Sequence, residues 1–236
     1  MLFRSGVLGG TFDPIHNGHL DLASAAHAAL DLTHVLVIPA NVPPHRPRPQ
    51  ASRFHRFAMV ALAVAGRAGW QASDMELGID APSYTTTTLL QFHDQGYAAT
   101  EIFFVIGADA FGEIATWRGY PNILDRAHFV VVSRPGCSVG QLRDRLPALI
   151  PRMVEPSRGG ALPDTPSIIL LDAQTADVSS TEIRRRVAAG DTIDGMVDPR
   201  VRQHIVQHGL YRPTAHDHRH DRGQARSTAD RLHGQD

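Results

Sequence analysis

Residues 9–20, GGTFDPIHNGHL, constrain the fold of this chain more than any other stretch. They follow a short apolar run that ends at Leu8, and they precede an alanine-rich segment with apolar residues at helical spacing. A glycine-rich turn between a strand and a helix gathers backbone N–H groups at the positive end of the helix dipole. His16 and His19 add donors there that can carry charge. The sequence therefore predicts an anion-binding junction at the start of an α/β domain.

The rest of the chain alternates between strand and helix patterns. Apolar runs predict strands at residues 3–8, 34–39, 101–107, 127–133 and 167–171, with a further extended segment at 70–79. Helices are expected at residues 18–30, 53–65, 179–187 (ended by Gly190) and 199–208, and a short irregular one at 111–117. The hydroxyls of residues 83–88 suit the N-cap of one more helix. This alternation predicts a doubly wound, Rossmann-like parallel sheet sandwich of the α/β class.

Composition limits the function further. The 236 residues suffice for one α/β domain, and the formal net charge of −1 gives no overall field that would attract nucleic acid. The single cysteine, Cys137, excludes an internal disulfide and any multi-cysteine zinc site. A signal-peptide pattern and an apolar run near the ~20 residues that span a bilayer are both missing, so we expect a cytoplasmic protein without membrane contact. We expect a domain at 1–212 and a disordered tail at 213–236, rich in His, Asp and Arg.

Several histidines have structural interpretations as well. His16 and His19 can serve as helix-capping residues, or join Asp13 as metal ligands. His204 and His208 have the spacing of zinc ligands, but no HExxH motif surrounds them, so we interpret them as surface positions. The proline-rich residues 41–50 form either a solvated loop or a mobile basic flap at the ligand-binding side of the sheet. The Rossmann fingerprint GxGxxG does not follow the first predicted strand, which disfavours a dinucleotide-dependent dehydrogenase.

Two motifs carry a resemblance to a known superfamily. GTFDPIHNGH at residues 10–19 resembles the T/HxGH signature of the nucleotidyltransferases, and VSSTEIR at 178–184 resembles their second signature, ISSTxIR. Further segments are similar to the nicotinate-nucleotide adenylyltransferase family: PPHR at 43–46, SYT at 83–85, FVIGAD at 104–109, RPG at 134–136 and LY at 210–211. The resemblance covers residues 3–212.

The resemblance implies transfer of AMP from ATP to nicotinate mononucleotide, giving deamido-NAD and pyrophosphate. The nucleophile is then a 5′-phosphate, which is already anionic at neutral pH and needs no general base. This agrees with the lack of an evident Ser-His-Asp or paired-carboxylate pattern in the sequence. Catalysis would rest on positioning and on electrostatic stabilisation of the shifting charge. The triphosphate implies Mg²⁺, held mainly by phosphates and water, and the sequence names no protein ligand for it.

The resemblance also implies roles for individual residues. His16, His19 and Arg184 are the expected catalytic residues, with His19 nearer the transferred phosphate and both histidines able to be charged when ATP is bound. The expected ATP-binding residues are Gly10, Thr11, Phe12, His16, His19, Ser179, Ser180 and Arg184. The expected acceptor-binding residues are Tyr84, Thr85, Asp109, Trp117, Arg134, Arg46 and His45. Trp117 would stack on the pyridine ring, Arg134 and Arg46 are the two cations considered for the carboxylate, and Asp109 would hold a ribose hydroxyl or orient a neighbour.

Some features of the chain depart from the family or leave alternatives open. Thr87 stands where the family usually has an acidic residue, and Arg46 stands where it often has lysine. An adenylyltransferase that prefers nicotinamide mononucleotide or phosphopantetheine is one alternative. A catalytically silent module that binds adenylates and reports to a partner is another, although its phosphate motifs would be expected to be damaged and these are intact. The sequence leaves open the oligomeric state (a homo-oligomer included), the motion of the flap and the role of the tail.

Overall fold

The computed structural model describes residues 4–43, 47–78, 81–156 and 163–213, and every structural statement below concerns those residues. They form a seven-stranded sheet in which all strands are parallel, in the order β3-β2-β1-β4-β5-β7-β6. The strands are β1 Ser5–Gly10, β2 His34–Pro39, β3 Trp70–Ala72, β4 Ile102–Gly107, β5 His128–Val132, β6 Met153–Val154 and β7 Ile168–Leu171.

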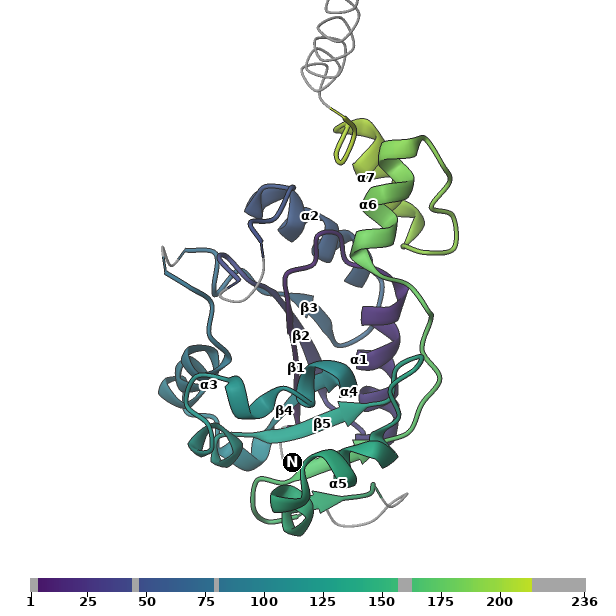
Figure 1. Ribbon diagram of the computed structural model, residues 1–236. Coiled ribbons are helices and arrows are strands. Elements are labelled where there is room, and N and C mark those ends of the chain that lie inside the picture. Colours follow the sequence, from purple (N-terminus) through teal and green to yellow (C-terminus); the bar gives the residue numbers. More distant parts are fainter. Residues whose placement is uncertain (1–3, 44–46, 79–80, 157–162, 214–236) are drawn as a thin grey trace, which may run out of the picture.

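Helices cover both faces of this sheet (Figure 1). The α-helices are α1 Asn17–Leu30, α2 Arg53–Val64, α3 Thr85–Asp94, α4 Ala108–Phe111, α5 Leu142–Arg145, α6 Ser180–Ala189 and α7 Pro199–Gln207. One apolar core lies between the sheet and α1, α2, α6 and α7. A second lies on the other face, beneath α3, α4 and α5. The doubly wound α/β sandwich predicted from the sequence is confirmed.

The central strands explain why the sheet is parallel and sandwiched. All residues of β4 and β5 are buried, so both faces of these strands need a cover, which only crossover helices supply. The strand order reverses between β1 and β4, which are hydrogen-bonded neighbours although a long segment separates them in sequence. In open α/β sheets, ligands bind at the carboxyl ends of the strands at such a reversal. The predicted anion-binding turn begins at Gly10, at the carboxyl end of β1.

The elements begin and end at residues that suit them locally. Ser52, Ser179 and Asp198 cap the N-termini of α2, α6 and α7 with side-chain oxygens. Helix α6 ends at Gly190, whose φ of 80° lies in the left-handed region that favours glycine. The helix expected at residues 179–187 and ended by Gly190 is therefore confirmed, with Ser179 as its N-cap residue.

Several local predictions were wrong. The extended segment expected at residues 70–79 is a strand only at β3, and turns follow it. Where a single irregular helix was expected at 111–117, α4 ends at Phe111 and a separate 3₁₀ turn covers Ile114–Thr116. The short strand β6 and the helix α5 were not predicted. The hydroxyls of residues 83–88 do not cap α3, because its N-cap residue is Tyr84, which forms no side-chain capping bond.

Other predictions fall outside the described residues. The tail at 214–236 is among them, so the domain boundary at residue 212 stays a prediction. No helix among the described residues is long and apolar enough to cross a lipid bilayer.

Candidate active site

The turn after β1 is shaped by contacts between its own residues. Phe12 is buried and adopts a φ of 49°, which folds its ring back onto Gly10. A Cβ atom on Gly10 would lie 2.8 Å from Cε1 of Phe12, so this close approach requires glycine. The Phe12 ring also packs edge-on against His19, with 5.0 Å between ring centroids. Gly10 therefore leaves room for the Phe12 ring, and that ring packs against His19, one of the two predicted catalytic histidines.

The two histidines of the first motif lie together at the N-terminus of α1. His16 is the N-cap residue of that helix, and its ring stacks on His19 with 3.6 Å between centroids and 27° between planes. The backbone N–H of His16 donates to Nδ1 of His19 at 3.3 Å. Because Nδ1 of His19 accepts this bond, the proton of the neutral ring is on Nε2. His19 thus presents an Nε2–H donor at the positive end of the α1 dipole.

His16 is held in its neutral form. It is only 2% exposed, and its Nδ1 has no hydrogen-bond partner among the described residues. Burial, assisted by the positive charge of Arg134, lowers the pKa of His16 from 6.5 to about 3. A buried polar atom without a partner is rare in a folded protein and often marks a place where a ligand completes the bonding.

Asp13 is the anchor of this turn. Its carboxylate accepts hydrogen bonds from the backbone N–H of Gln50 (2.8 Å), the backbone N–H of Ala51 (3.1 Å) and the hydroxyl of Tyr211 (2.8 Å). The alternative in which Asp13, His16 and His19 bind a metal is not supported, since these three do not form a ligand-spaced group among the described residues. The sequence analysis missed the anchoring role because its partners are distant in sequence.

Arg56 is a second residue that the sequence analysis missed. It is 1% exposed and donates to the carbonyl oxygens of Thr11 (2.7 Å), Ala40 (2.5 Å) and Asn41 (3.2 Å). These carbonyls lie after the ends of β1 and β2, so one guanidinium joins two loops at the edge where ligands bind. Burial lowers the pKa of Arg56, and the carboxylate of Asp13 counteracts that shift. The sequence feature that could have indicated this role is an arginine on the face of α2 that otherwise carries apolar residues.

The second motif contacts the first directly. The hydroxyl of Ser180 donates to the carbonyl of Pro14 at 2.8 Å, and Nη1 of Arg184 donates to the carbonyl of Asp13 at 2.8 Å. The hydroxyl of Ser179 accepts from the backbone N–H of Glu182 and caps α6. These two contacts span 166 and 171 residues of sequence, so they bring the two predicted phosphate motifs together. Arg184 is half-buried, and its other terminal nitrogen donates to Oγ1 of Thr181 at 3.3 Å.

Two segments that carry predicted acceptor residues, the start of α3 and the segment after α4, contact each other. The hydroxyl of Thr86 donates to the carbonyl of Arg118, and the guanidinium of Arg118 lies 4.7 Å from the ring centroid of Tyr84. Trp117 is half-buried and packs edge-on against Phe104 at 6.4 Å. These contacts place Tyr84 and the N-terminus of α3 close to the segment that carries Trp117. The indole is anchored on one side by the core and is not a fully buried core residue.

Asp109 and Arg134 interact with each other after the ends of β4 and β5. Nη1 of Arg134 lies 3.5 Å from Oδ2 of Asp109. A Cβ atom on Gly107 would meet Oδ1 of Asp109 at 2.5 Å and Cδ of Arg134 at 2.7 Å, so this glycine leaves room for both side chains. The charge of Arg134 acts on His16, which places this cation near the phosphate motif.

A buried carboxyl group lies beside the start of α3. Oε1 of Glu76 accepts the hydroxyl of Thr88 at 2.5 Å, and burial raises the pKa of Glu76. Thr87, at the position that is usually acidic in the family, is exposed. Glu76 thus brings a carboxyl group to the start of α3 from the segment before it, and Thr88 of α3 donates to that group.

The flap is described only at its ends. Its first residues bind the segment before α3, because the backbone N–H of Asn41 donates to Oγ of Ser83 and the backbone N–H of Ser83 donates to the carbonyl of Val42. His45 and Arg46 lie outside the described residues, so their predicted roles in acceptor binding stay predictions.

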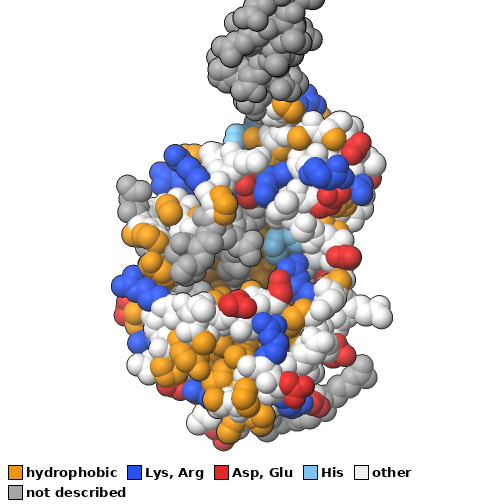
Figure 2. Space-filling model, viewed as in Figure 1, with side chains coloured by type: hydrophobic (Ala, Val, Ile, Leu, Met, Phe, Trp, Pro, Cys, Tyr) orange, Lys and Arg blue, Asp and Glu red, His pale blue; other side chains and the backbone are white. Residues whose placement is uncertain are grey.

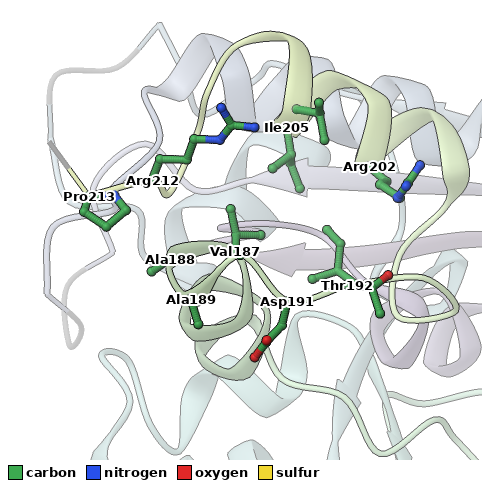
Figure 3. Close-up of a pocket in the computed structure, with 12 residues that line it drawn as sticks. Val187, Ala188, Ala189, Asp191, Thr192, Arg202, Ile205, Arg212 and Pro213 are labelled. Atoms are coloured by element: carbon green, nitrogen blue, oxygen red, sulfur yellow. The ribbon is translucent and has the colours of Figure 1, made fainter.

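The molecular surface is hollowed between the part that carries α2, α6 and α7 and the part that carries α3, α4 and α5 (Figures 1 and 2). Figure 2 shows a histidine side chain in this hollow, with cationic and acidic side chains on its walls. A separate hollow of about 680 Å³ lies between α6 and α7, where Val187 and Ile205 face each other (Figure 3). None of the predicted site residues lines this second hollow.

The sequence of this chain is similar to those of known proteins over most of its length. The cytidylyltransferase-like family model matches residues 7–186. The chain is 41% identical over 221 residues to a protein named probable nicotinate-nucleotide adenylyltransferase from Desulfatibacillum aliphaticivorans, covering 88% of this chain and 99% of the relative. A protein of the same name from Roseiflexus sp. (strain RS-1) is 41% identical over 208 residues, covering 88% and 97% of the two chains.

Solved structures show the same fold. The nicotinic acid mononucleotide adenylyltransferase of Plasmodium falciparum, complexed with NaAD, matches with a TM-score of 0.66 at 16% identity, over 89% of this chain and 97% of that one. A putative nicotinate-nucleotide adenylyltransferase from Vibrio parahaemolyticus matches with a TM-score of 0.58 at 19% identity. On the sequence relationships and the fold together, this chain is a nucleotidyltransferase that belongs to the cytidylyltransferase-like family and, within it, to the nicotinate-nucleotide adenylyltransferases.

Proposed function

We propose that this chain transfers AMP from ATP to nicotinate mononucleotide, in the biosynthesis of NAD. One observation carries the proposal: Arg184 and Ser180 of the second motif bind the carbonyls of Asp13 and Pro14 in the first motif. This contact brings a helix N-terminus from each motif to the carboxyl end of β1, next to the reversal of strand order. Two helix N-termini and several cations suit a triphosphate.

In the proposed reaction, an oxygen of the acceptor's 5′-phosphate forms a bond to the α-phosphorus of ATP. The bond between that phosphorus and the bridging oxygen to the β-phosphate breaks, and pyrophosphate leaves. The nucleophile is already anionic, so the protein has to align two anions and stabilise the charge that moves onto the leaving group. Nε2–H of His19, at the positive end of the α1 dipole, is suited to that charge. Arg134 and Arg184 are the nearby cations, and the neutral His16 supports the ring of His19.

The acceptor is proposed to bind between the start of α3 and Trp117. The half-buried indole offers one face for a pyridine ring, and the N–H groups near Tyr84 and Thr85 suit the nicotinate carboxylate. Asp109, paired with Arg134, is positioned to orient that cation or to accept a hydrogen bond from a ribose hydroxyl. His45 and Arg46 would complete the acceptor site from the flap.

The metal requirement in this proposal is Mg²⁺ carried by ATP. The described residues offer no carboxylate cluster for it, because Asp13 is bound by three donors and Asp109 pairs with Arg134. This donor set fits a cation held by phosphates and water, whose chemistry would be to neutralise part of the phosphate charge. The substrates are then small molecules, and we place the reaction in the cytoplasm.

The test is pyrophosphate release measured side by side with nicotinate mononucleotide, nicotinamide mononucleotide and phosphopantetheine, each with ATP and Mg²⁺. We expect the fastest release with nicotinate mononucleotide and almost none from the His19→Ala control. Faster release with either other acceptor would refute the acceptor assignment. Calorimetric binding of ATP with no release from any acceptor would refute the enzymatic proposal and favour an adenylate-binding module.

A further inference from the structure

Three histidines from two helices meet outside the proposed active site. His55 lies in the first turn of α2, His204 lies in α7, and His208 is the C-cap residue of α7. Nδ1 of His55 and Nε2 of His204 are 3.1 Å apart. The ring of His208 lies 4.3 Å from that of His204 and 4.8 Å from that of His55, between centroids. The interpretation of His204 as a surface position was wrong, since it is partly buried against α2, whereas His208 is exposed.

The spacing of these rings matches a metal site. One ring nitrogen from each histidine lies within 4.8 Å of the others, and no other group of three His, Cys, Asp or Glu among the described residues does so. Zinc–nitrogen bonds of about 2.0–2.1 Å at tetrahedral angles place ligand nitrogens about 3.3 Å apart. The pair His55–His204 already has nearly this spacing. A tetrahedral site requires the exposed His208 side chain to move its ring nitrogen, now within 4.8 Å of the other two, to the same distance.

The surroundings suit a divalent cation. His204 and His208 are one helical turn apart, which presents both rings on the same side of α7. Burial decreases from His55 and His204 to His208, so the group is open to solvent on one side, where water can complete the coordination.

We propose that His55, His204 and His208 bind one Zn²⁺ ion, with water in the fourth position. Imidazole nitrogens suit zinc, and three histidines with an open position are a known coordination set. This site is separate from the proposed reaction and from the ATP-bound Mg²⁺. Its ligands come from the two helices that pack together at this end of the molecule, so the ion would cross-link α2 to α7.

The position of the site explains what such a cross-link would stabilise. His55 directly precedes Arg56, which holds the carbonyls of Thr11 and Ala40. His208 is three residues before Tyr211, which binds the carboxylate of Asp13. Both contacts support the turn that carries His16 and His19. Zinc would therefore hold together two segments that each fix the first motif, without contacting any substrate.

The test is zinc binding by the full chain in a background where the tail histidines at 216, 218, 220 and 233 are replaced by glutamine, which removes competing ligands. After dialysis against zinc and then buffer, metal analysis should find one zinc per chain. His55→Gln, His204→Gln and His208→Gln should each weaken zinc binding at least tenfold. The matched control His93→Gln, a histidine of α3 outside the group, should leave it unchanged.

Two further measurements separate a site from adventitious binding. Cobalt should give the visible absorption of a tetrahedral ion in the tail-substituted background, and His208→Gln, which changes an exposed side chain, should abolish it. Zinc should raise the thermal midpoint of this background and leave that of His204→Gln unchanged. The proposal would be overturned if the tail-substituted chain bound no zinc. It would also be overturned if zinc binding in that background were unchanged by His55→Gln and by His208→Gln. Circular dichroism identifies any variant that fails to fold. If a buried-site variant does not fold, zinc binding by His208→Gln, which changes an exposed side chain, tests the proposal.

Discussion

The hydroxyl of Tyr211 donates a 2.8 Å hydrogen bond to Oδ1 of Asp13, across 198 residues of sequence. The end of the described chain thereby supports the turn after the first strand. Both groups are buried, and burial together with the carboxylate charge raises the pKa of Tyr211, so its hydroxyl remains a donor over the whole working pH range. The active-site turn therefore depends on a residue that lies beyond the second phosphate motif.

Tyr211→Phe should destabilise the protein and slow the reaction. The substitution removes one of the three donors to the buried carboxylate of Asp13 and leaves only the two backbone N–H groups. This loss should lower the free energy of unfolding by about 1–3 kcal/mol. Loosening of the turn should reduce kcat as well. Urea unfolding and pyrophosphate release measure the two effects, with Tyr97→Phe, a tyrosine that packs on Phe92, as the matched control. A variant as stable as the control would show that the hydrogen bond has no net effect.

His19→Ala should preserve the fold and lower kcat by roughly 10²–10³, the usual loss when one preorganised donor to developing charge is removed. The reason is that Nε2–H of His19 is presented at the N-terminus of α1 by the bond from His16 to Nδ1. Steady-state kinetics with saturating ATP and acceptor gives the effect. His27→Ala, in the last turn of the same helix, is the control and should retain nearly full activity. An unchanged kcat would remove His19 from the mechanism.

Trp117→Ala should raise the KM for the acceptor far more than the KM for ATP. Loss of aromatic stacking on a ring costs about 1–3 kcal/mol, which corresponds to roughly 5- to 150-fold in affinity. Trp117→Phe keeps a stacking face and should restore most of the affinity. If both variants change the two KM values equally, the indole has only a packing role against Phe104.

His128→Asn should make the protein less sensitive to acid. His128 is fully buried, and burial lowers its pKa from 6.5 to about 4. Between these values only the unfolded chain binds the proton, so the folded state loses about 1.4 kcal/mol per pH unit as the pH falls, and nothing is lost above pH 6.5.

The measurement for His128→Asn is urea unfolding at a series of pH values from 7 down to 4. The side-chain oxygen of asparagine can still accept a hydrogen bond from the backbone N–H of Ser167, as Nδ1 of His128 does in the native protein. Below pH 6.5, the free energy of unfolding of His128→Asn should fall less steeply with decreasing pH than that of the native chain, by about 1.4 kcal/mol per pH unit. The buried His16 is retained in this variant and remains a second source of acid sensitivity. His93→Asn is the control. Identical slopes in His128→Asn and the native chain would contradict the assigned burial effect.

The order of strands and helices could be predicted because it depends on local patterns. The run at residues 101–107 is apolar throughout, and it forms a strand buried on both faces. Gly190 ends α6 because it supplies the left-handed conformation there. The errors arose where local patterns are short or ambiguous, as in the two-residue strand β6 and the turns after β3.

Partners that are distant in sequence could not be predicted for the site. The motif pairing indicated that Arg184 and His16 share a site, but not that Arg184 binds the carbonyl of Asp13. The sequence did not indicate that a third histidine lies beside His204 and His208, because His55, whose Nδ1 lies 3.1 Å from Nε2 of His204, is 149 residues before it. Such contacts depend on how α2 and α7 pack, which no local pattern encodes.

By itself, the sequence determined the α/β class and the two phosphate motifs, because apolar periodicity and glycine-rich turns act over a few neighbouring residues. Only the tertiary structure decided which groups are bonded in the turn after β1. Asp13 receives donors from residues 50, 51 and 211, and His16 loses its charge because other parts of the chain bury it. Burial and hydrogen bonding between remote segments exist only once the sheet has brought those segments together.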